Sequence, residues 1–233
     1  MTQPFSFAYY RQMLETAQES GYSVTSFADY DSSRPRTIIM RHDVDYTLNG
    51  VLELATIEHE LGASASYLFR VHAHEYNIFT PHVYALIRHI RSLGHDIGLH
   101  FEASAVGRAL GLSPDAVLRK EKALMELVFD APVVTGSEHR DISHDVHRTP
   151  PFRDSHDIYS FGFRYYGMDE AYTKEMKYLS DSNGFWREGD LAQHLGKHER
   201  LQVLIHPDWW FESDLLLKGP YAHGLGNGRD GAY

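Results

Sequence analysis

Ionisable side chains follow six short apolar segments of the chain, at the point where each segment ends. Burying carboxylates and imidazoles costs free energy unless they pair with one another or bind a metal. In a parallel α/β barrel the carboxyl ends of the strands meet on one rim, so groups at six strand ends indicate a common active site. The groups are Asp43 with Asp45, Arg70 with His72 and His74, His100 with Glu102, Glu138 with His139 and Arg140, Asp181, and His206 with Asp208.

Two of these groups have a spacing that favours metal binding. Asp43 and Asp45 are two residues apart, so their side chains point the same way from an extended strand, as do those of His100 and Glu102. Converging carboxylates and imidazoles suit zinc or another divalent first-row metal. Such a metal activates water against an acyl carbon, with a carboxylate as base and a histidine as acid. The alternative is one functional aspartate and one that caps a loop.

The apolar segments that position these groups alternate with helices. This alternation predicts parallel strands with crossover helices. An open doubly wound sheet and a closed barrel both fit, and the charged strand ends favour the barrel. Strands are predicted at 37–40, 65–71, 96–101, 132–135, 178–179 and 201–205, and helices at 8–20, 49–61, 81–93 and 113–129.

Composition limits the class of protein. A chain of 233 residues is long enough for one domain, predicted over 1–233 with a loop-rich tail over 212–233. The net charge of −10 argues against nucleic acid as a partner, and the absence of cysteine excludes disulfides and thiolate metal sites. No apolar run approaches a transmembrane segment and no signal peptide is recognisable, so we expect a cytoplasmic enzyme. The oligomeric state is open.

The order of four motifs resembles the NodB-homology polysaccharide deacetylases, carbohydrate esterase family 4 and its relatives. The motifs are Arg-His-Asp-Val-Asp at 41–45, Ala-Ser-Tyr-Leu-Phe at 65–69, Leu-Gly-His-Asp-Ile-Gly-Leu-His at 93–100 and Leu-Ile-His at 204–206. The resemblance covers roughly 37–210. It implies a distorted parallel (β/α) barrel, often seven-stranded, that removes acyl groups from sugars with a divalent metal, most often Zn²⁺.

The resemblance also implies a role for six residues by their position in the motifs. Asp43 matches the general base, Asp45 and His100 match metal ligands, Arg140 matches the arginine that orients the base, Asp181 matches an acidic residue that tunes the site, and His206 matches the catalytic acid.

One position departs from the family pattern. The second metal-binding histidine of the family falls at Ser104, and serine is a poor substitute for it. Glu102, which shares a strand face with His100, is one candidate for the missing ligand. His139, at a neighbouring strand end, is another, and weak or lost metal binding is the third reading.

Aromatic residues near the predicted rim are candidates for sugar binding, because aromatic faces stack on the apolar face of sugar rings. Two adjacent tryptophans that leave a strand end cannot both face the same core, so one of Trp209 and Trp210 is expected to line a groove. Tyr76 and Trp186 are the other candidates, with core packing as the alternative.

Three functions follow from these features. The first is a metal-dependent hydrolase that removes an acyl group, N-acetyl foremost, from a sugar of a bacterial surface polysaccharide such as O-antigen, or of its precursor. The second is a non-catalytic carbohydrate-binding protein on a decayed deacetylase scaffold. The third is a deformylase or cyclic-amide hydrolase of the same fold.

Overall fold

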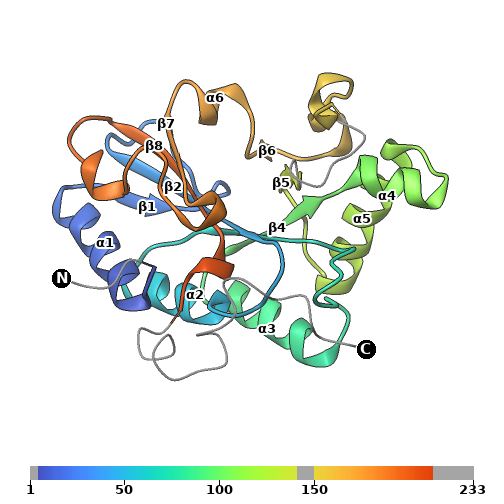
Figure 1. The fold of residues 1–233 in the computed structure, drawn as a ribbon, viewed down its shortest axis with the longest axis horizontal. Coiled ribbons are helices and arrows are strands. Elements are labelled where there is room, and N and C mark those ends of the chain that lie inside the picture. The colour runs from blue at the N-terminus through green and yellow to red at the C-terminus, as the bar shows by residue number, and fades with distance from the viewer. Residues whose placement is uncertain (1–4, 141–149, 212–233) are drawn as a thin grey trace.

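A curled parallel sheet surrounded by helices makes up the protein (Figure 1). The computed structural model describes residues 5–140 and 150–211. The strands are β1 (Ser23–Thr25), β2 (Thr37–Val44), β3 (Ser66–Phe69), β4 (Asp96–Phe101), β5 (Thr135–Glu138), β6 (Tyr165–Tyr166), β7 (Lys177–Ser180) and β8 (Arg200–Ile205).

The sheet has the order β6-β5-β4-β3-β2-β8-β7, and the strands of the described residues pair in parallel. β1 and β3 share one edge of β2: β1 pairs with its first half and β3 with its second half. Within the described residues no ladder joins β6 to β7, so the curled sheet forms an open barrel. The predicted distorted parallel (β/α) barrel, seven strands across, is confirmed.

The helices lie outside the curl of the sheet, as Figure 1 shows for α1, α2, α3 and α5. Ser6 and Ser113 cap α1 and α5 by accepting the backbone N–H three residues ahead, and Pro114 opens α5. The helices are α1 (Phe7–Glu19), α2 (Val51–Glu60), α3 (Pro81–Ser92), α4 (Ala103–Leu110), α5 (Pro114–Phe129) and α6 (Glu170–Thr173). In the part of the chain that the structure describes, none of them is long and apolar enough to cross a membrane.

Several elements differ from the sequence prediction. The fourth strand starts at Thr135 rather than Pro132, because the segment that pairs with β4 is the polar Thr-Gly-Ser-Glu and not the apolar run before it. The helix α4 and the short strands β1 and β6 were not predicted. The predicted tail over 212–233 lies outside the described residues.

The central strand β2 is buried along its whole length, and its two faces carry different charged groups. Arg41 contacts Asp43 and Ser137 of β5, on the inner face of the curl. His42 points the other way, toward Glu58 of α2. The two-residue period of a strand thus gives β2 one charged network inside the barrel and another between the sheet and the helices.

The outer network is built around Glu58, whose side chain has no exposed surface. Its carboxylate accepts hydrogen bonds from the hydroxyls of Tyr10 (2.5 Å) and Tyr67 (2.7 Å), and lies 2.7 Å from His42 Nε2. Burial alone would raise the pKa of Glu58, but His42, His95 and Tyr10 hold it below its ordinary value. An ionised carboxylate therefore ties α1, α2, β2 and β3 together.

This network yields a stability prediction. Replacing Glu58 by Ala leaves two buried hydroxyls and an imidazole without their acceptor, so the free energy of unfolding is expected to fall by about 3–5 kcal/mol. Urea unfolding followed by circular dichroism measures this change. The matched control is Glu60→Ala on the same helix, which breaks an exposed pair with Arg11 and is expected to cost under about 1 kcal/mol. Equal losses in the two variants would contradict a central role for Glu58.

Candidate metal centre and active-site cleft

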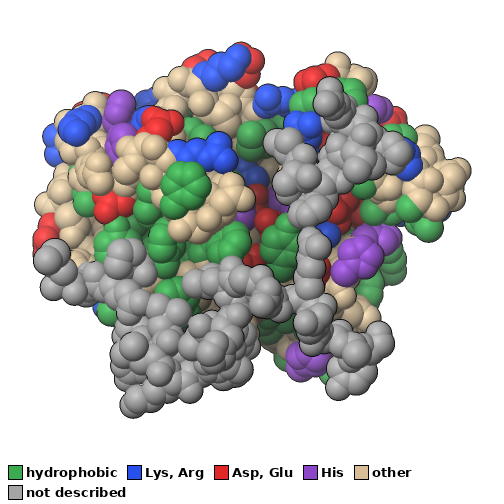
Figure 2. All heavy atoms as spheres, in the orientation of Figure 1, with side chains coloured by type: hydrophobic (Ala, Val, Ile, Leu, Met, Phe, Trp, Pro, Cys, Tyr) green, Lys and Arg blue, Asp and Glu red, His purple; other side chains and the backbone are tan. Residues whose placement is uncertain are grey.

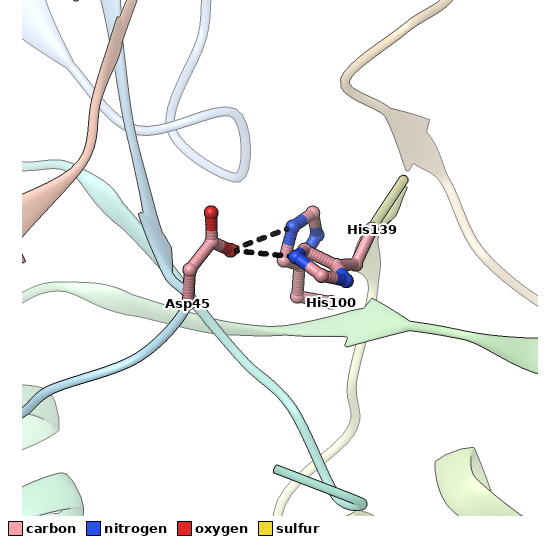
Figure 3. A group of neighbouring side chains, drawn as sticks. All are labelled: Asp45, His100 and His139. Atoms are coloured by element: carbon pink, nitrogen blue, oxygen red, sulfur yellow. Dashed lines mark ion pairs between the residues drawn. The ribbon is translucent and has the colours of Figure 1, made fainter. Parts of the chain in front are cut away.

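Three potential metal ligands converge at the carboxyl ends of three strands of the sheet: Asp45 just after β2, His100 in β4 and His139 just after β5. Figure 3 shows both imidazoles facing one oxygen of Asp45. Asp45 Oδ1 lies 3.2 Å from Nε2 of His100 and 3.7 Å from Nε2 of His139. One ligand atom from each residue lies within 4.8 Å of the others, close enough for a single ion to bind all three.

The outer nitrogen of each imidazole has its own partner. His100 Nδ1 lies 3.1 Å from the carbonyl oxygen of Ser137, which only accepts, so Nδ1 carries the hydrogen. His139 Nδ1 lies 3.0 Å from Oε1 of Glu102. Each inner Nε2 can therefore present a lone pair to an ion bound beside Asp45 Oδ1. Such fixed tautomers are typical of histidines that bind metal.

Glu102 lies behind His139 rather than beside His100 and Asp45. Its Oε2 accepts from Arg70 Nε (3.0 Å) and Nη2 (2.9 Å), and Arg70 Nη1 donates to the carbonyl oxygen of Asp45 (2.6 Å). Burial would raise the pKa of Glu102, but His139 and Arg70 hold it below its ordinary value. Of the two candidates for the third ligand, the structure brings His139 into the group and makes Glu102 its support.

The donor set fits a divalent first-row metal such as zinc. Asp45 Oδ1 is buried and accepts no hydrogen bond. Burial would raise the pKa of Asp45, but the neighbouring His100, His139 and His206 hold it well below its ordinary range, so the carboxylate is ionised. One carboxylate and two imidazoles also leave room for water or substrate at the ion. Ser104 lies in α4, and His139 approaches from β5 instead.

Asp43, the predicted base, forms a buried two-point ion pair with Arg41. Nε and Nη2 of Arg41 donate to Oδ1 (2.8 Å) and Oδ2 (2.5 Å) of Asp43. Burial would raise the pKa of Asp43, but Arg41 and His100 hold it below its ordinary value. Arg140 was expected to orient this carboxylate; Arg41 does so, because it sits two residues earlier on the same strand face. Arg140 lines the cleft.

His206, at the end of β8, is held by Asp181, just after β7. Its Nδ1 lies 2.6 Å from Oδ1 of Asp181, and its backbone N–H donates to both oxygens of the same carboxylate. His206 Nε2 points to the metal group, 3.7 Å from Oδ2 of Asp45. Burial would lower the pKa of His206, but the bond and the charge of Asp181 outweigh it and raise the pKa to about 9.

These groups line a cleft of about 930 Å³, and acidic and histidine side chains are visible inside the hollow in Figure 2. Five further aromatic or basic residues line the cleft and were not expected from the sequence, because side-chain type alone does not show which residues reach a cleft across the sheet. They are Tyr46, Tyr166, Tyr178, Arg153 and Arg187.

Of the four aromatic residues expected to bind substrate, only Trp209 is among the residues that line this cleft. Trp210 is 1% exposed, and its indole N–H donates to Asp181 (2.8 Å). Tyr76 donates to the carbonyl oxygen of Val44 and accepts from the backbone of Arg70, behind the site. Trp186 stacks on Phe5. The structure thus places these three in supporting positions, where their polar atoms or faces meet other parts of the protein.

Comparison with known proteins gives a structural likeness but no match in sequence. No protein-family model and no curated protein matches the chain. Among solved structures, the chain is similar to the Streptococcus pyogenes deacetylase PplD in complex with acetate, with 10% identity and a TM-score of 0.46. The match covers 86% of this chain and 83% of that chain.

Metal content tests the ligand assignment. We expect the protein loaded with zinc to hold about one ion per chain. Asp45→Ala, His100→Ala and His139→Ala remove a ligand and should abolish stoichiometric binding, while Glu102→Gln should weaken affinity about 10- to 100-fold by releasing His139. Plasma emission spectrometry and chelator competition measure both effects.

Ser104→Ala is the matched control for this experiment, because it alters the position where the family pattern has a histidine. Its zinc content and affinity should equal those of the unaltered protein. Full zinc binding by His139→Ala, or its loss in Ser104→Ala, would refute the assignment of His139.

Proposed function

We propose that the protein is a metal-dependent hydrolase that removes an acyl group, N-acetyl foremost, from a sugar. The observation that carries this proposal is the grouping of Asp45, His100 and His139. This group lies between the carboxylate of Asp43, which Arg41 holds, and the imidazole of His206, which Asp181 holds. Asp43 lies 3.4 Å from His100 Nε2, and His206 lies 3.7 Å from Asp45. Acyl hydrolysis needs a base for the attacking water and an acid for the leaving group, and these two residues are suited to those roles.

Asp43 is suited to accept a proton from water. The Arg41 fork keeps its carboxylate ionised and fixes its orientation, and Arg41 is itself anchored to Ser137 of β5. A divalent ion held by the three ligands would polarise the acyl carbonyl and lower the pKa of the attacking water. Asp43 then takes the proton that the water loses as its oxygen bonds to the acyl carbon.

His206 is suited to donate a proton. With a pKa raised to about 9, its imidazole is protonated at neutral pH, and Asp181 holds Nδ1 so that Nε2 faces the cleft. As the bond from the acyl carbon to the sugar nitrogen or oxygen breaks, Nε2 supplies the proton that the leaving group needs. The proton taken by Asp43 balances the one given by His206, and the products are a carboxylic acid and the free amine or alcohol.

The cleft supports a sugar as the substrate. Its volume of about 930 Å³ is large for the site of a single small acyl amide, and Tyr46, Tyr166, Tyr178 and Trp209 offer aromatic surface along it. We therefore infer that a glycan unit lies in the cleft with its acyl group at the metal ligands. A bacterial surface polysaccharide such as O-antigen, or its precursor, and zinc as the ion remain parts of this proposal.

The alternative of a non-catalytic binding protein was motivated by Ser104. His139 lies beside Asp45 and His100 and is a candidate for the ligand that Ser104 cannot supply. The pairing of Asp43 with Arg41 and of His206 with Asp181 also favours catalysis. A deformylase or cyclic-amide hydrolase would use the same groups, so a panel of N-formyl, N-acetyl and cyclic amide substrates separates these activities.

Replacing Asp43 by Asn tests its role as base. The substitution keeps the shape of the side chain but removes its basicity, so turnover of an N-acetyl sugar should fall by about 10²- to 10⁴-fold. Acetate release measures turnover, while circular dichroism and zinc content check that fold and metal are intact. The control is Asp130→Asn on the surface, where a left-handed backbone tolerates Asn and full activity is expected. Undiminished turnover by Asp43→Asn would exclude this mechanism.

A pH profile tests the pairing of His206 with Asp181. The carboxylate raises the pKa of His206, so the acid form persists up to about pH 9. Asp181→Asn removes that charge, the pKa falls, and His206 loses its proton at lower pH. The alkaline limb of kcat/KM should therefore move down by about one pH unit or more. If kcat/KM falls equally at every pH and the alkaline limb of the profile stays in place, Asp181 acts on packing alone.

A further inference from the structure

Three arginines line the cleft in addition to Arg41: Arg140, Arg153 and Arg187. They come from separate segments, after β5, in the short turn Phe152–Asp154 and after β7. The chain as a whole carries 32 acidic and 22 basic residues, so a cluster of arginines contrasts with its net negative charge. Basic side chains are also visible along the edge of the hollow in Figure 2.

The acidic residues of the cleft form no ion pair with Arg153 or Arg187 among the described residues. Asp43 is paired with Arg41, and Asp45 belongs to the metal group. Glu188 forms an ion pair with Lys177. Glu138 accepts a hydrogen bond from the backbone of Phe152, 2.9 Å away, and it also interacts electrostatically with Arg140 and Arg153. Its carboxylate offsets one of the three charges of Arg140, Arg153 and Arg187, so this part of the cleft wall keeps a net positive charge beside the metal ligands.

Two of the three arginines have donors to spare. Among the described residues, Arg187 makes no ion pair, and its guanidinium lies over the ring of Phe185 at 6.0 Å. Arg153 donates from Nη1 to the carbonyl oxygen of Met168, and within the same described part of the chain it forms no ion pair. A guanidinium has five N–H donors in a flat fork that matches a carboxylate or phosphate.

We propose that the substrate is an anionic sugar derivative, whose phosphate or carboxylate is bound by Arg153 and Arg187 while its acyl group lies at Asp45, His100 and His139. This inference rests on the proposed function, since it uses the same cleft. A neutral glycan can accept hydrogen bonds from arginine, but it leaves the positive charge of Arg153 and Arg187 unmatched. An anionic group on the substrate gives Arg153 and Arg187 the ion-pair partner that neither has among the described residues.

Calorimetric binding to the full-length protein tests the proposal. The probes are N-acetylglucosamine, which is neutral, and N-acetylglucosamine 1-phosphate. Both are titrated into zinc-free and zinc-loaded protein, because a phosphate also binds zinc directly. The phosphate is expected to bind about tenfold more tightly than the neutral sugar in the zinc-free protein, and Arg153→Gln and Arg187→Gln should each remove most of this preference.

The matched control is Arg88→Gln, on α3 at a separate pocket of about 250 Å³, which should keep the full preference. Equal affinity for the neutral and phosphorylated sugars would overturn the proposal. So would a preference that survives both substitutions, or that Arg88→Gln removes equally. Absence of measurable binding by the phosphate would also count against it.

Two further probes separate the sources of negative charge. UDP-N-acetylglucosamine carries a diphosphate, and N-acetylglucosaminuronic acid carries a carboxylate on the sugar ring. Tighter binding of the first indicates an activated precursor, and tighter binding of the second indicates an acidic polysaccharide unit. Because binding is measured without zinc and without turnover, an inactive protein that still prefers anions would refute the hydrolase alone. An active protein without the preference would refute the anionic substrate alone.

Discussion

The two aspartates of β2 set the main electrostatic constraint on this fold. Asp43 and Asp45 are only 2% and 8% exposed, and they point the same way from one strand. Two neighbouring buried carboxylates are costly unless opposite charge lies close to both. Arg41 neutralises the first, while His100, His139 and His206 approach the second from β4, β5 and β8. The curl of the sheet brings these strand ends together, so the charge balance and the barrel geometry depend on each other.

The same strand anchors the helices on its other face. His42 points away from the cleft to Glu58, which also receives the hydroxyls of Tyr10 and Tyr67. Residues of β2 that alternate along the chain thus hold the site on one side and helices α1 and α2 on the other. A shift of β2 by one residue in its pairing register would exchange these two sets and place the His42 imidazole at the position of the proposed base.

Features of the fold that follow from local sequence patterns could be predicted from the sequence. The alternation of apolar strands with helices predicted a parallel sheet, and the charged residues at the strand ends favoured a barrel with these residues on its rim. Which residues from different strands contact one another could not be predicted in the same way. Whether Glu102 or His139 completes the metal group depends on Arg70, which holds Glu102 from another strand end. That Trp210 turns inward likewise depends on the buried carboxylate of Asp181. Both outcomes result from contacts between segments far apart in sequence, which spacing and residue type do not encode.

Arg70 has a consequence for how this protein can change in evolution. One guanidinium donates to the main chain of Asp45 and to the carboxylate that supports His139, so two of the three potential ligands depend on a single side chain. A lysine cannot reproduce that three-way geometry with its single ammonium group. Stepwise replacement of Arg70 or Glu102 would disturb both ligands before any new partner existed. The pair is therefore expected to covary among homologues, and neither member should drift alone.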